Sequence, residues 1–66
     1  MSPSPVTIKV TFLRVTTAGL LVEVDDFEVW IPRAIVEYDG LLDHCEPREV
    51  IEITLPHDAA YARGLV

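Results

Sequence analysis

The chain has 66 residues, half of them hydrophobic, and carries a net charge of −6 from eleven acidic and five basic residues. A chain of this length forms one small domain and buries only about 60% of its unfolded surface, so a deep catalytic pocket is not expected. The hydrophobic fraction excludes a disordered tail, and the negative charge disfavours phosphate backbones and anionic membranes as partners.

The N-terminal part of the chain predicts a short leader and one long strand. Residues 1–5 contain two serines and two prolines, so we predict a flexible leader there and a single domain over residues 6–66. β-Branched and aromatic residues predict the first strand over residues 7–17. Its apolar positions change parity between Phe12 and Leu13, which indicates a bulge or a sharp bend. Gly19 then lies in a turn candidate.

The middle of the chain predicts a hairpin. Alternation over residues 20–24 and 27–31 indicates two strands, with Asp25 and Asp26 as the turn between them. Pro32 ends the third strand or marks it as an edge, and residues 33–35 are predicted to form one helical turn. Trp30 has the opposite parity to Val29, so it lies either on the outer surface or beneath the loop that follows.

The C-terminal third predicts a long loop over residues 37–48, a strand over residues 49–55 and a short helix that begins at residue 57. Gly64 suits the C′ position of that helix, and Leu65 suits the apolar contact that accompanies such an end. The predicted fold class is mostly β: a small antiparallel barrel or rolled sheet, SH3-like or OB-like, with four to five strands and a short C-terminal helix.

Candidate catalytic and metal-binding residues do not form a recognised pattern. His44, Cys45 and His57 are zinc-ligand types but lack paired ligand spacing, so we expect neither a metal nor a cofactor. Adjacent side chains in an extended loop point apart, which makes His44 and Cys45 a poor catalytic dyad. A hairpin tip offers no burial to raise the pKa of a carboxylate. We therefore expect a protein that is not an enzyme.

The residue types that dominate interfaces indicate a binding surface instead. Tryptophan, tyrosine and arginine most often act as interface anchors, and a dense group of carboxylates imitates phosphate spacing. The alternative for the anchors is structural, with Trp30 packed beneath the loop and Arg33 paired with a neighbouring acid. The predicted binding residues are Trp30, Arg33, Tyr38, Asp25, Asp26 and Glu28.

Three segments also resemble a known group of proteins. The run LLVEVDDFEVWIPR at residues 20–33, followed by ITLP at 53–56 and YARGL at 61–65, is similar to short proteins encoded by phages, prophages and other mobile elements. Many members of that group have a serine where this chain has Ala34. The resemblance implies a small β fold and a binding role, such as inhibition of host defence systems including CRISPR complexes.

From these observations we expect an acidic, non-enzymatic inhibitor that docks on a host protein. A single cysteine indicates a reducing compartment, and no basic leader or long apolar run occurs, so we expect the host cytoplasm and no membrane. Unpaired strand edges favour a homodimer or higher homo-oligomer.

Two other functions remain open. One is a small-molecule or nucleotide site at an oligomer interface. The other, which the net charge disfavours, is binding of single-stranded nucleic acid, with stacking platforms and cations from Trp30, Tyr38, Phe12, Arg14, Arg33 and Lys9.

Overall fold

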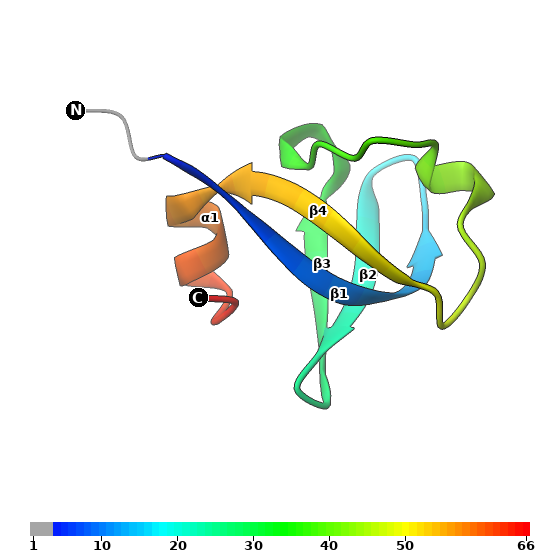
Figure 1. The fold of residues 1–66 in the computed structure, drawn as a ribbon, viewed down its shortest axis with the longest axis horizontal. Coiled ribbons are helices and arrows are strands. Elements are labelled where there is room, and N and C mark those ends of the chain that lie inside the picture. The colour runs from blue at the N-terminus through cyan, green and yellow to red at the C-terminus, as the bar shows by residue number, and fades with distance from the viewer. Residues whose placement is uncertain (1–3) are drawn as a thin grey trace.

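The computed structural model describes residues 4–66 as a four-stranded antiparallel sheet with a short helix (Figure 1). The strands are β1 (Pro5–Val15), β2 (Gly19–Val24), β3 (Phe27–Pro32) and β4 (Val50–Pro56), in the order β3-β2-β1-β4. Helix α1 (His57–Ala62) follows β4 directly, and 3₁₀ turns occupy Arg33–Ile35 and Leu42–His44. These elements confirm the mostly β class, the antiparallel arrangement and the C-terminal helix.

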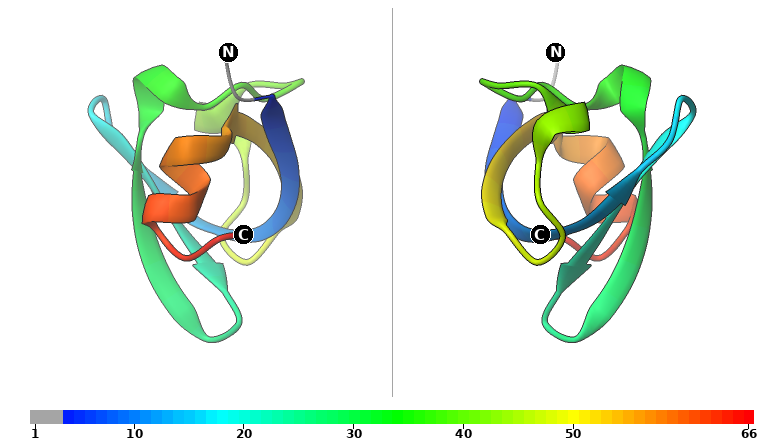
Figure 2. Two further views of the ribbon diagram at one scale, coloured as in Figure 1. Left: turned by 90° about the vertical axis from the view of Figure 1, so that its left-hand side faces the viewer. Right: turned by 90° about the vertical axis from the view of Figure 1, so that its right-hand side faces the viewer.

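Of the two predicted forms, a barrel or a rolled sheet, the closed barrel is wrong, because the sheet is open. Closure would require β3 to pair with β4, whereas each of these strands has one neighbour in the sheet. Figure 2 shows the sheet curving so that β3 lies across from β1 and β4, with α1 between them. The helix contacts β1 and β4.

The bend in β1 arises where the sequence indicated it. Phe12 pairs with Val22 and Arg14 pairs with Leu21, so Leu13 is an extra residue in the ladder. A bulge of this kind increases the local twist and bends the strand. The bend lets one continuous strand of 11 residues pair with β4 along its first half and with β2 along its second.

The core lies on the concave face of the sheet, where the inward positions of all four strands meet. A loop residue and a helix residue complete it. Its buried side chains are Val10, Phe12, Leu20, Val22, Ile31, Leu42, Ile51, Ile53, Leu55 and Ala60. Most of them occupy alternate strand positions, which is why hydrophobic alternation predicted the strands.

The end of α1 has the geometry that the sequence predicted, and the start of β1 differs from the prediction by one residue. Gly64 has φ of 72° and donates to Tyr61 O, while Leu65 N donates to Ala60 O at 2.9 Å. This pattern is a Schellman motif, and Leu65 packs against the core as predicted. At the other end β1 begins at Pro5, one residue inside the predicted leader, and the rest of that leader except Ser4 lies outside the described residues. No helix within residues 4–66 is long and apolar enough to cross a membrane.

Candidate functional site

Trp30 lies on the outer face of the sheet. On β3, Ile31 pairs with Leu20 and both side chains are fully buried, whereas Trp30 pairs with Leu21 on the opposite face. Half of the Trp30 surface is exposed (50%). The sequence left two positions open for this side chain, and the outer surface is the one that the structure shows.

The indole ring lies over the start of β2, where a glycine leaves room for it. A Cβ atom at Gly19 would lie 3.3 Å from Trp30 Cε3 and 3.3 Å from the Ile31 carbonyl oxygen. On the same face, the guanidinium carbon of Arg14 lies 5.9 Å from the centroid of the Trp30 ring. This distance falls within the range of a cation–π contact, and half of the Trp30 surface remains accessible.

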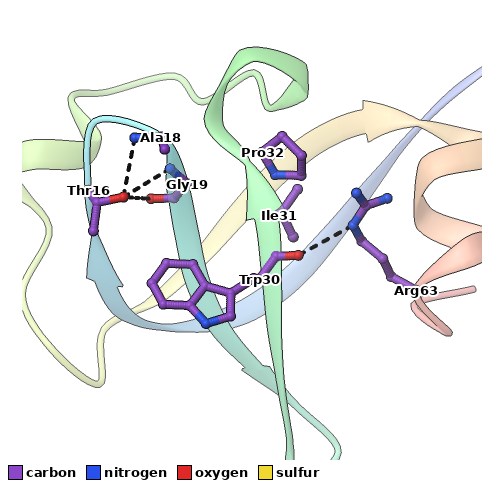
Figure 3. Close-up of a pocket in the computed structure, with 7 residues that line it drawn as sticks. All are labelled: Thr16, Ala18, Gly19, Trp30, Ile31, Pro32 and Arg63. Carbon is purple, nitrogen blue, oxygen red and sulfur yellow. Dashed lines mark hydrogen bonds between the residues drawn. The ribbon is translucent and has the colours of Figure 1, made fainter.

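A shallow hollow of about 350 Å³ adjoins the indole (Figure 3). One wall is the β1–β2 turn, in which Thr16 Oγ1 accepts hydrogen bonds from the backbone N–H groups of Ala18 and Gly19. Arg63 approaches from the side of β3 opposite the ring: its Nε donates to Trp30 O at 3.4 Å, and its Nη1 donates to Ala59 O at 2.9 Å. The hollow therefore combines an aromatic wall with a cation held by backbone carbonyls.

The Arg33 side chain makes hydrogen bonds within the domain. Its guanidinium donates to both carboxylate oxygens of Asp43, at 3.2 and 2.8 Å, and to Thr16 O at 3.2 Å. The hydrogen bond and the charge of Arg33 lower the pKa of Asp43, and the same contact raises the pKa of Arg33. Arg33 thus ties the loop after β3 to the β1–β2 turn.

Tyr38 is also separate from the Trp30 surface. It is half-buried against the core beside Cys45 and beneath Gly40, whose added Cβ would lie 3.0 Å from Tyr38 Cε2. The hydrogen bond with Cys45, followed by burial, raises the pKa of Tyr38. The ring therefore helps to fix the loop between Pro32 and β4.

The hairpin carboxylates lie along the exposed end of β3. Asp25 and Asp26 have φ of 50° and 69°, so they form the tight turn that the sequence predicted. Glu28 shares the outer face with Trp30, two positions away, and pairs across the ladder with Glu23. Within residues 4–66 the carboxylates of Asp25, Asp26 and Glu28 have no salt-bridge partner.

Of the predicted binding residues, the structure therefore brings four together along β3 and its turn. These are Trp30, Glu28, Asp25 and Asp26, while Arg33 and Tyr38 lie in the contacts described above. Arg63 and Gly19 were not predicted as site residues. Their contacts with Trp30 join segments distant in sequence, and no local pattern predicts such pairs. In the described part of the chain, no three His, Cys, Asp or Glu side chains gather as a metal site.

The chemistry that this surface offers is that of binding: one indole face, a guanidinium near it, carboxylates without a salt-bridge partner in residues 4–66, and an open strand edge. No protein-family model matches the chain, and neither a curated protein nor a solved structure shows significant similarity to it. The resemblance to short phage and prophage proteins therefore stays a prediction.

Proposed function

We propose that the protein is a non-enzymatic binding protein that docks on another protein through the outer face of β3. One observation carries this proposal: the only tryptophan is half exposed, yet it is held in place by Arg14 and seated on Gly19 beside a hollow. A fixed, exposed indole loses little conformational entropy on binding, and such an anchor contributes about 2 kcal/mol or more when a partner covers it.

The charge around the anchor favours a partner with a basic surface. Asp25, Asp26 and Glu28 extend from Trp30 to the tip of the hairpin, which projects from the body of the domain (Figure 1). Free carboxylates in a row attract a cationic groove and accelerate association with it. An inhibitor that occupies the nucleic-acid groove of a host protein, such as a CRISPR-type defence complex in the host cytoplasm, fits both this pattern and the resemblance.

The proposal is tested by affinity capture from a host lysate with wild-type protein and two matched variants. Trp30→Ala should lose the captured partner, while Tyr61→Ala, which removes another exposed aromatic ring on α1, should retain it. Adding the purified partner should shift Trp30 emission to shorter wavelength, because the ring leaves water. Equal capture by folded Trp30→Ala and wild type would contradict the proposal.

A second candidate is an accessory protein that binds single-stranded nucleic acid, and the position of the Arg14 guanidinium over the exposed Trp30 ring is the observation in its favour. An exposed ring beside a cation suits a base and its phosphate. The other aromatic residues predicted to stack on bases do not support this function, because Phe12 is 3% exposed and Tyr38 packs against the core. This function predicts quenching of Trp30 by oligothymidylate that weakens steeply with added salt. As part of this second candidate, we also propose that the open, bent sheet is related to SH3-like or OB-like folds.

A further inference from the structure

The free edge of β3 presents backbone groups at alternate residues. Asp25 and Asp26 form a two-residue turn, so Val24 and Phe27 are a hydrogen-bonded pair, and every second pair along the ladder follows the same pattern. The hydrogen bond from Arg33 N to Ala18 O, at 3.1 Å, fits the same alternation, because Arg33 lies an even number of residues along the chain from Phe27. Glu28 and Trp30 consequently direct their N–H and C=O groups away from β2. Pro32, which has no N–H, occupies the next position of this type.

The two edges of the sheet are protected to different degrees. On β4, Thr54 exchanges hydrogen bonds with Glu37 at 2.7 and 2.9 Å, so the loop covers that edge. On β3, the contact to the edge is the 3.4 Å hydrogen bond from Arg63 to Trp30 O. Within residues 4–66, Trp30 N–H and both backbone groups of Glu28 have no hydrogen-bond partner. An edge of this kind is a template for another strand.

Charge along the β3 edge is divided between its ends. The hairpin end carries Asp25, Asp26 and Glu28, and the Arg63 guanidinium contacts the edge at Trp30 O, in the second half of the strand. An edge that is acidic at one end and basic at the other is complementary to itself when two copies run antiparallel. Two-fold symmetry requires such self-complementarity of an isologous interface.

We propose that two copies of the chain associate by antiparallel pairing of β3 with β3, about a two-fold axis that passes between their Val29 residues. In this register Glu28 of each copy faces Trp30 of the other, and each such pair exchanges both of its N–H···O bonds. Trp30 O then accepts from a backbone N–H in place of Arg63.

Apolar contacts support the same register. Phe27 is 71% exposed and lies on the inner face beside a hollow of about 280 Å³ that Val24, Val29 and Leu65 help to line. In the pair, the two Val29 side chains meet at the axis, and Phe27 of each copy remains on the inner face beside this hollow. The indoles remain on the outer face of the joined sheet, so this association is independent of the proposed function.

The test is the mass of the protein in solution, measured by sedimentation equilibrium for wild type and two proline variants. Glu28→Pro removes the outward N–H at the pairing edge and leaves the β2 ladder intact, as Pro32 already does at an equivalent position. Glu52→Pro is the matched control: it removes the same charge and an outward N–H from the β4 edge, since Glu52 has the same phase as Thr54.

We expect wild type and Glu52→Pro to have twice the 7.4 kDa chain mass, and Glu28→Pro to raise the dissociation constant roughly tenfold or more. We also expect Trp30→Ala to remain dimeric while losing a captured partner, which separates this inference from the proposed function. A monomeric wild type at concentrations up to about 1 mM would overturn the inference, as would a Glu28→Pro variant that dimerises like wild type.

A second measurement keeps the inference testable if a proline variant does not fold. Amide hydrogen exchange in wild type should slow at Glu28 and Trp30 as the protein concentration rises, because those N–H groups become bonded only in the pair. Exchange at Glu52 should be independent of concentration. Fast exchange at Glu28 and Trp30 at all concentrations would overturn the pairing through this edge.

Discussion

The guanidinium of Arg14 lies over the Trp30 ring, 5.9 Å from its centroid, because β1 contains an extra residue. In an unbroken strand Arg14 would have the parity of Phe12 and would point into the core. The bulge at Leu13 turns Arg14 to the outer face, where it faces Leu21 on β2, with Trp30 beyond it on β3. One feature of the backbone thus bends the sheet and also supplies the cation next to the exposed indole.

Replacing Arg14 with methionine should make the Trp30 ring more mobile and more accessible to solvent without unfolding the domain. An exposed cation–π contact contributes about 0.5–1 kcal/mol, so the loss of stability should be no larger than that. Acrylamide should quench Trp30 fluorescence more efficiently in Arg14→Met than in wild type. Lys9→Met, which removes another outer-face cation, should leave the quenching unchanged, and equal quenching in both variants would contradict the contact.

Replacing Gly19 with alanine should displace the Trp30 ring, because the ring lies over this position. The added Cβ lies 3.3 Å from Trp30 Cε3 and 3.3 Å from a backbone oxygen that does not yield easily. We expect the free energy of unfolding to fall by about 1 kcal/mol or more, and the emission of Trp30 to change. Gly64→Ala is the control: its φ of 72° also makes alanine unfavourable, by about 1 kcal/mol, but nothing lies within 4 Å of its Cβ, so emission should not change.

Local sequence patterns predicted the parts of the fold that local physics determines. Alternation marked the strands, the parity change at Phe12 and Leu13 marked the bulge, and the sequence Arg63-Gly64-Leu65 marked the end of α1. Barrel closure was predicted wrongly because it depends on the meeting of two distant edges. No periodicity within one strand indicates whether two such edges will meet.

The candidate site was predictable to a similar extent. Residue type alone favoured Arg33 and Tyr38 as anchors, yet both are engaged in loop contacts with partners ten and seven residues away, Asp43 and Cys45. Parity placed Trp30 on the outer face but did not show whether a loop would cover it. The contacts from Arg14 and Arg63 come from β1 and the end of α1, so only the tertiary structure reveals them.

Asp43 should make folding stability depend on pH in the acidic range. The hydrogen bonds and charge of Arg33 lower the pKa of Asp43 in the folded state, so the unfolded state binds a proton more readily. The stabilisation is present above the unfolded pKa, about 3.9, and is lost as the pH falls through the lower folded pKa. Asp43→Asn should therefore reduce stability at neutral pH and match wild type in strong acid.

Urea unfolding at a series of pH values measures this difference, with Asp39→Asn as a control from the same loop that lacks a salt-bridge partner in the described residues. An Asp43→Asn curve parallel to that of wild type at every pH would show that the pair with Arg33 does not stabilise the fold.

Tyr38 should ionise above its usual pKa of about 10. The hydrogen bond with Cys45 and partial burial both favour the neutral phenol and raise the pKa of Tyr38. Stability from this contact is complete below pH 10 and is lost as the pH rises through the higher folded pKa. Ultraviolet titration in a Tyr61→Phe background isolates the Tyr38 phenol, and adding Cys45→Ala should lower its pKa. An unchanged titration would assign the raised pKa to burial and to the nearby carboxylates of Glu49 and Asp39.

The β2–β3 turn should be stabilised by glycine at Asp26. Asp25 and Asp26 both adopt positive φ, 50° and 69°, in the turn type that prefers glycine at its second central position. A side chain in this region costs up to about 1 kcal/mol, and Asp26→Gly also removes repulsion between adjacent carboxylates. We expect a gain of about 0.5–1 kcal/mol in the free energy of unfolding. Asp39→Gly removes the same charge at a position without positive φ and should not stabilise the protein, so an equal gain in both variants would attribute the effect to charge.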